Sequence, residues 1–77
     1  MISELESVVL TCDLPKSGLA YGDVGTVVLV HGDGKAYEVE FTALDGDTVA
    51  VVTLDASQLR AARGSEIANA RTLARVG

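Results

Sequence analysis

The stretch VGTVVLVHGDGKAYEVEFT, residues 24–42, decides the fold. Two apolar or alternating runs, residues 24–31 and 36–42, flank a turn at residues 32–35 that contains Asp-Gly. Asp-Gly between such runs is the strongest short-range signal of a β-hairpin. The sequence therefore predicts two antiparallel strands joined by a tight turn.

Residues 36–42 alternate between two kinds of side chain. One face carries three large apolar residues, Tyr37, Val39 and Phe41. The other face carries Glu38 and Glu40. Alternation with a period of two is typical of a strand that has one face in the core and one in water. We expect the two carboxylates outside the sheet, as either a solvated face or an acidic patch for a partner.

Further strands are expected on both sides of this hairpin, over residues 7–12, 48–54 and 60–62. A long loop with the only proline covers residues 13–22, and a second Asp-Gly turn lies at residues 44–47. A helical turn capped by Asp55 precedes the last strand. Gly25, near the start of its strand, indicates a bulge or a close backbone approach.

This order of elements predicts an all-β fold, a small SH3-like barrel of four or five antiparallel strands over residues 1–62. Partial closure into a barrel protects strand edges from pairing with other chains. The expected core consists of Val8, Leu10, Val24, Val39, Phe41, Val52 and Leu54.

Residues 63–77 form a tail of different character. Its apolar residues recur at helical spacing, as in Ile67, Ala70 and Ala74. This spacing predicts a short helix over residues 66–75, with a strand over residues 66–71 as the alternative. A helix of this length is not stable alone in water, so it must pack on the barrel, on a second copy or on a partner.

Charge is divided unevenly along the chain. The net charge of −5 is the sum of −7 over residues 1–54, which hold nine acidic and two basic residues, and +2 over residues 55–77. An acidic body repels phosphate backbones, because nucleic-acid affinity comes largely from Lys and Arg. We therefore expect a protein partner, or a second copy of the chain, and no nucleic acid.

The residues suited to catalysis or metal binding are few: one His, one Cys and one Met. A structural zinc site needs four ligands, and a nucleophile needs an adjacent base. His31 near Asp33, and Cys12, are therefore expected to be structural. The Gly-rich segment at residues 22–26 lacks the Lys-Ser/Thr pair of a phosphate-binding loop. No catalytic, metal-binding or cofactor-binding residue is expected, and the chain is expected not to be an enzyme.

The expected location is the cytoplasm. A single cysteine excludes an intrachain disulfide, and the first six residues lack the features of a signal peptide. The longest aliphatic run, residues 27–30, is too short to cross a membrane.

Several motifs resemble those of a family of small bacterial proteins that carries a domain-of-unknown-function label. They are Asp13-Leu14-Pro15, Gly18-Leu19, residues 22–28, residues 37–41, Thr53-Leu54 and Gln58-Leu59-Arg60. In outline the chain is also similar to the SH3-like barrel of the nitrile hydratase β-subunit. The resemblance implies a small barrel without assigned chemistry. Some members are encoded beside predicted toxins, which implies an antitoxin-like or accessory role.

These observations together favour a non-catalytic protein–protein interaction module, and the product of a neighbouring gene is the candidate partner. A nucleic-acid-binding barrel is the alternative, and an enzyme completed only in an oligomer is a third reading. The candidate partner-binding residues are Glu38, Glu40, Arg60, Arg63, Ile67, Arg71 and Leu73.

Overall fold

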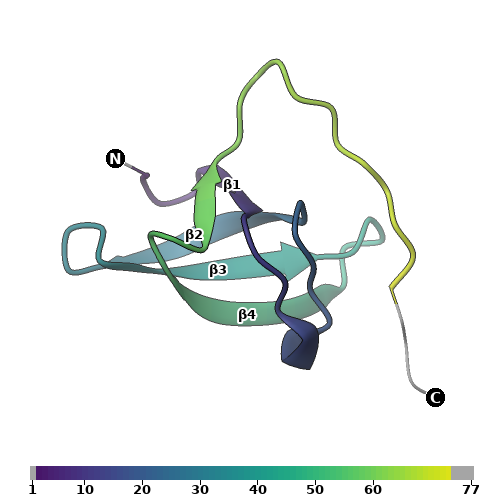
Figure 1. The fold of residues 1–77 in the computed structure, drawn as a ribbon, viewed down its shortest axis with the longest axis horizontal. Coiled ribbons are helices and arrows are strands. Elements are labelled where there is room, and N and C mark those ends of the chain that lie inside the picture. The colour runs from purple at the N-terminus through teal and green to yellow at the C-terminus, as the bar shows by residue number, and fades with distance from the viewer. Residues whose placement is uncertain (1, 74–77) are drawn as a thin grey trace.

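The fold is a single antiparallel sheet in the computed structural model, which describes residues 2–73. Its elements are β1 (Ser7–Leu10), the 3-10 turn η1 (Pro15–Ser17), β2 (Val24–His31), β3 (Ala36–Thr42), β4 (Thr48–Asp55) and β5 (Leu59–Ala61). The strands lie in the order β4-β3-β2-β1-β5, so the first strand sits between the second and the last (Figure 1). The all-β class and the five antiparallel strands are confirmed. The sheet is open, with β4 and β5 at its edges.

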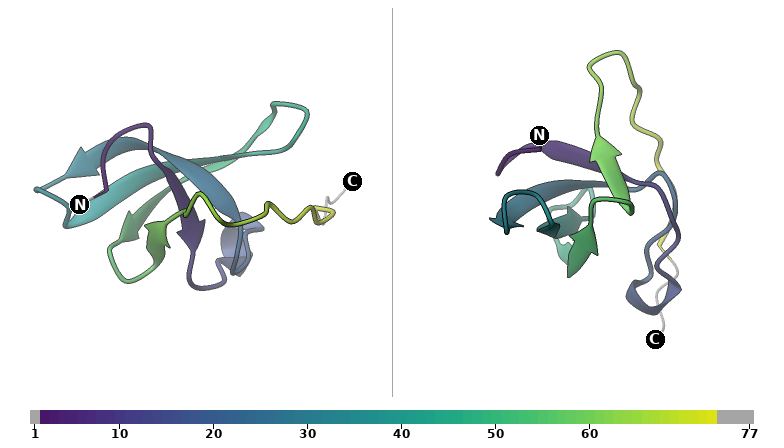
Figure 2. Two further views of the ribbon diagram at one scale, coloured as in Figure 1. Left: turned by 90° about the horizontal axis from the view of Figure 1, so that it is seen from above. Right: turned by 60° about the vertical axis from the view of Figure 1, so that its left-hand side comes forward.

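The tight turn between β2 and β3 forms where Asp-Gly predicts it. Asp33 adopts a φ of 58° and Gly34 a φ of 96°, both in the left-handed region that Asp tolerates and Gly adopts freely. The backbone N–H groups of Gly34 and Lys35 both donate to the carbonyl of His31, at 3.1 and 3.0 Å. The long strands β2 and β3 leave this turn as a curved ribbon (Figure 2).

The core forms mainly where alternating residues of the sheet face the same side. The buried apolar residues are Val8, Val9, Leu10, Leu19, Val27, Tyr37, Val39, Phe41, Leu54 and Leu59. The expected core position of Val24 is wrong, since this side chain is 48% exposed. Its neighbour Gly25 pairs with the fully buried Val8 and takes the core-facing position. Val52 is half-buried against the core.

Gly25 marks the expected close backbone approach. A Cβ at this position would lie 2.6 Å from Cγ1 of Val39 and 2.8 Å from Cε1 of Phe41. Only glycine lets β2 cross β3 at this distance without moving the core. The bulge itself lies further along β2, between Val27 and Leu29.

The tail differs from its prediction. Residues 62–73 contain neither a helix nor a strand, so the helix expected over residues 66–75 and the alternative strand over residues 66–71 are both wrong for the described residues. Residues 74 and 75 lie outside them. Ile67 is 94% exposed, so the apolar stripe has no surface to cover and helix formation gains nothing from packing. The chain instead loops away from β5 and returns to the start of β2 (Figures 1 and 2).

The turn between β4 and β5 is a simple turn and not a helical one. Asp55 caps it as expected, because its carboxylate accepts a hydrogen bond from the backbone N–H of Ser57 at 2.8 Å and another from the Ser57 hydroxyl. These bonds lower the pKa of Asp55. The only helical turn among the described residues is η1, in the loop that contains Pro15.

Candidate partner-binding surfaces

Two rows of opposed residues cross β2, β3 and β4 on the side away from the core. One row is Thr26, Glu40 and Val51, and the other is Leu29, Glu38 and Thr53. Directly opposed residues in a sheet share a face, so these side chains are neighbours. We call these six residues, together with Val28, the outer face.

The bulge in β2 brings an additional apolar residue to the outer face. The register shifts between Val27 and Leu29, so Val28 is an extra residue without a direct partner on β3. Val28 is 41% exposed, Leu29 44% and Val51 55%. The outer face therefore presents three exposed aliphatic side chains around two carboxylates.

Threonines on β4 orient the two carboxylates. The hydroxyl of Thr53 donates to both carboxylate oxygens of Glu38, at 2.9 and 2.8 Å, and Nε2 of His31 lies 2.7 Å from Oε2. The contact with His31, followed by those with Thr53, lowers the pKa of Glu38. Glu40 accepts one hydrogen bond, from the hydroxyl of Thr48 at 2.7 Å. Among residues 2–73, no cation lies within ion-pair distance of Glu40.

The free edge of β4 has backbone groups that point away from the sheet. The N–H of Asp55 donates to the side chain of Gln58 at 3.0 Å, so it does not point towards β3. Bonded and non-bonded positions alternate along an antiparallel ladder. The N–H and C=O groups of Thr53 and Val51, two and four positions earlier, therefore also point to the open edge.

A bidentate ion pair holds the start of the tail. Nη1 and Nη2 of Arg60 donate to Oε1 and Oε2 of Glu66 at 2.8 and 2.7 Å. The backbone N–H of Arg63 donates to the same carboxylate at 2.7 Å. The bonds from Arg60 and then Arg63 lower the pKa of Glu66 to about 2. This charge pair folds residues 60–66 into a closed loop.

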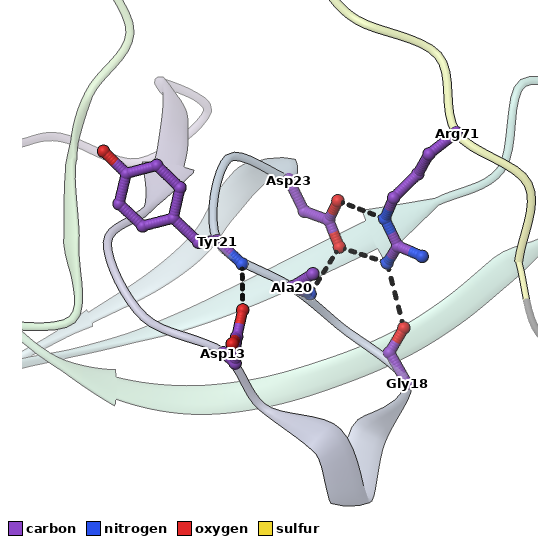
Figure 3. Close-up of polar contacts among 6 residues, drawn as sticks. All are labelled: Asp13, Gly18, Ala20, Tyr21, Asp23 and Arg71. Carbon is purple, nitrogen blue, oxygen red and sulfur yellow. Dashed lines mark hydrogen bonds and ion pairs between the residues drawn. The ribbon is translucent and has the colours of Figure 1, made fainter.

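A second ion pair holds the end of the described tail (Figure 3). Nε and Nη2 of Arg71 donate to Oδ1 and Oδ2 of Asp23 at 2.8 and 2.5 Å, and Nη2 also donates to the carbonyl of Gly18 at 3.0 Å. Asp23 also accepts a hydrogen bond within its own loop, from the backbone N–H of Ala20 at 2.9 Å. The bond from Arg71 is the main cause of the lowered pKa of Asp23.

A groove of about 750 Å³ lies between the returning tail and the sheet. Its walls include Leu19 and Phe41 from the core, Val49 from β4, and residues 68–73 of the tail. The residues of the tail that form this wall are themselves mostly exposed. The tail therefore stands over the groove without filling it.

The candidate partner-binding residues fall into two groups. Glu38 and Glu40 lie together on the outer face, on the side away from the core that the alternation predicts. The remaining five lie on β5 or on the tail: Arg60, Arg63, Ile67, Arg71 and Leu73. Arg60 and Arg71 form ion pairs with carboxylates of the same chain, one near each end of the described tail. Their role in partner binding stays a prediction.

Three features of these surfaces were not found from the sequence. They are the threonine partners of the two glutamates, the exposure of Val51, and the pairing of Asp23 with Arg71. The threonines could have been found by aligning residues 48–54 against Glu38 and Glu40 in a hairpin register. The pair with Arg71 has no local signal, because the two residues lie 48 positions apart.

Clusters of candidate metal ligands and membrane-spanning helices are absent from the part of the chain that the structure describes. Residues 2–73 contain no group of three or more His, Cys, Asp or Glu side chains that could hold a metal ion. Within the same residues there is no helix with the length and apolar character needed to cross a membrane.

The one cysteine of the chain, Cys12, is half-buried, with the side-chain amide of Gln58 at 4.0 Å from its sulfur.

Comparison with known proteins gives one family. The sequence model of a domain of unknown function, DUF4926, matches residues 4–61, which cover all five strands. No curated protein and no solved structure matches the chain. The expected family resemblance is confirmed, and the likeness to SH3-like barrels and to nitrile hydratase stays a prediction.

Proposed function

We propose that this chain, which belongs to the DUF4926 family, is a non-catalytic module that binds a protein partner through its outer face. The observation that carries the proposal is the combination of exposed aliphatic and acidic side chains on one surface. Val28, Leu29 and Val51 are each more than 40% exposed, and they surround Glu38 and Glu40.

This combination suits a protein interface. Exposed apolar side chains gathered on one surface mark interaction sites, because isolated exposure is common but clustering is not. Carboxylates beside them add specificity and speed association with a basic partner. The −7 charge of residues 1–54 extends the attraction beyond direct contact.

A protein partner is favoured over nucleic acid by the arrangement of the arginines. Arg60 and Arg71 each pair with a carboxylate of the chain, which cancels the charge that a phosphate would need. We extend the proposal to an antitoxin-like or accessory role in the bacterial cytoplasm, which rests on the family resemblance alone.

The test is photo-crosslinking in an extract of the source cells. The photo-reactive amino acid p-benzoylphenylalanine is placed at Leu29 or Val51 on the outer face. Leu44, which is 99% exposed in the turn between β3 and β4, serves as a matched control outside the outer face. We expect one discrete protein adduct from each outer-face position and none from the control.

Two results would overturn the proposal. Equal adducts from Leu44 and from the outer-face positions would show that the contacts are non-specific. Adducts that disappear on nuclease treatment would favour the nucleic-acid alternative.

A further inference from the structure

We propose that β4 accepts an extended segment of the partner as a sixth, antiparallel strand, and that this segment alternates apolar residues with Lys or Arg. The inference rests on the proposed protein-binding function and names the partner's conformation and chemistry. Strand addition to an open sheet edge is a known mode of peptide recognition, in which backbone bonds supply affinity and alternate side chains supply specificity.

The backbone of β4 is ready for such pairing. The N–H and C=O groups of Val51 and Thr53 point to the open edge, as the bond between Asp55 and Gln58 establishes. These groups provide up to four backbone hydrogen bonds to a neighbouring strand. Two features limit the length of the added strand. One is the bulge that displaces Val49, and the other is the turn that follows Asp55, so the added strand pairs with the part of β4 between them.

The two edges of the sheet are protected differently. β5 has three residues, carries Arg60 at its centre and continues into the closed loop of the tail. β4 has eight residues and contains neither Lys nor Pro, the residues that commonly protect an edge strand. Of the two edges, β4 is therefore the one on which a partner strand can form a continuous ladder.

The side chains around this edge define the sequence of the added strand. On the core side, Ala50 and Val52 of β4 are only half-buried, so apolar residues placed beside them extend the core. On the other side, Glu38 and Glu40 lie on β3, about 10 Å, or two strand spacings, from the added strand. The carboxylates of both glutamates lean over β4, where threonine hydroxyls bond to them, so Lys and Arg side chains of the added strand meet them over β4.

β4 contains no Lys or Arg, so a second copy of the chain brings no positive charge to this edge. In the antiparallel register in which Val51 opposes Val51, Asp47, the residue before β4, opposes Asp55. Like charges directly opposite each other destabilise strand pairing. A partner strand with Lys or Arg beside Val51 and Thr53 instead places positive charge next to Glu38 and Glu40, which is why a basic partner segment is the occupant we propose.

The probe is an eight-residue peptide of alternating Lys and Val, acetylated and amidated at its ends. In an antiparallel pair, opposed residues share a face, so the Lys residues oppose Val51 and Thr53 and form the backbone bonds. Methylation of the Lys backbone nitrogens must therefore weaken binding by about tenfold or more, since those bonds are lost. Methylation of the Val nitrogens, which face away from β4, must leave the dissociation constant within about twofold.

Amide hydrogen exchange locates the peptide on the protein. With peptide at about ten times its dissociation constant, the amides of Val51 and Thr53 must exchange about tenfold more slowly than in the free protein. The amide of Val52 points to β3 and serves as an internal control. The substitution Val51→Lys must weaken peptide binding, whereas Val51→Thr, which keeps the branched side chain, must not.

The outcomes separate the two proposals. If the Glu38→Gln, Glu40→Gln double variant loses the peptide but methylation of the Lys nitrogens has no effect, strand addition is wrong and the outer face still binds. If the peptide does not bind, strand addition is wrong. The protein-binding function is then tested separately, by crosslinking at Leu29. Slow exchange at Val51 and Thr53 without peptide, with a dimer in sedimentation, would make a second copy the occupant and overturn the inference.

Discussion

The sheet and the tail are held in place by different forces. The sheet and the loop before β2 together bury ten apolar residues, and the backbone ladder continues through five strands. The tail, residues 62–73, is fixed mainly by two charge pairs, Arg60–Glu66 and Arg71–Asp23, and leaves Ile67 almost fully in water. Hydrophobic burial acts on many residues at once, whereas each exposed ion pair contributes about 0–1 kcal/mol. The tail can therefore open while the sheet stays folded.

The largest expected effect in this comparison comes from the substitution Phe41→Ala. Phe41 is 2% exposed and forms part of the core on β3. Its removal should lower the free energy of unfolding by about 3–5 kcal/mol, because apolar contacts are lost and a cavity remains. Thermal unfolding followed by circular dichroism measures this effect. An unchanged melting temperature would mean that the sheet does not depend on its core.

A smaller loss of stability is expected from Gly25→Ala. The new Cβ would lie 2.6 Å from Cγ1 of Val39 and 3.0 Å from the backbone oxygen of Glu40, so the core or β3 must shift. Overpacking of this kind costs about 1–3 kcal/mol. Gly64→Ala in the tail is the matched control, because a Cβ there has no neighbour within 4 Å. Equal melting temperatures for the two variants would contradict the close approach of β2 to β3.

The substitution Arg71→Gln should release the tail and leave the sheet intact. The change removes the bonds to Asp23 and Gly18 but no apolar contact of the core, so the free energy of unfolding should fall by less than about 1 kcal/mol. Backbone NMR relaxation should show faster motion in residues 67–73. Arg63→Gln is the control, since the tail bond of Arg63 comes from its backbone N–H and survives the change. Slow motion of the tail in both variants would mean that other contacts hold it.

The smallest expected effect is the response of the tail to acid. Arg60 holds the pKa of Glu66 at about 2, below the usual value of 4.5. A lowered pKa means that the stabilisation is complete above pH 4.5 and is lost as the pH falls towards 2. An NMR titration of the Glu66 carboxyl group should show this midpoint, and Arg60→Gln should return it towards 4.5. A midpoint near 4.5 in the unmodified protein would show that the pair does not form in solution.

The sheet could be predicted from the sequence because its signals are local. The alternation in residues 36–42 identifies the buried and exposed faces of β3, and Asp-Gly identifies the turns on both sides. β2 gave a poorer prediction because it is apolar on both sides, so nothing local distinguishes Val24 from a core residue. Its core-facing position belongs to Gly25, and only the packing of Val39 and Phe41 against it reveals why.

The tail could not be predicted because distant contacts determine its conformation. Local spacing in residues 66–75 favours a helix, but Glu66 and Arg71 have partners elsewhere in the chain. The outer face could be predicted in part, less completely than the sheet and more completely than the tail. The direction of Glu38 and Glu40 follows from their alternation, whereas their threonine partners depend on the register between β3 and β4, which one bulge shifts.

The order of the strands also constrains how a growing chain can fold. β1 is made first, yet one of its two neighbours is β5, and Val8 pairs with Ala61. A nascent chain that ends before Leu59 can form the meander of β2, β3 and β4 from contacts between adjacent segments, but β1 then has an unpaired side. Pairing β5 with β1 closes the long loop of chain between them. Loop closure costs entropy before the new backbone bonds stabilise the chain, and such non-local contacts slow folding. Completion of the sheet must therefore wait for the last strand, and until then β1 exposes a second edge to neighbouring chains.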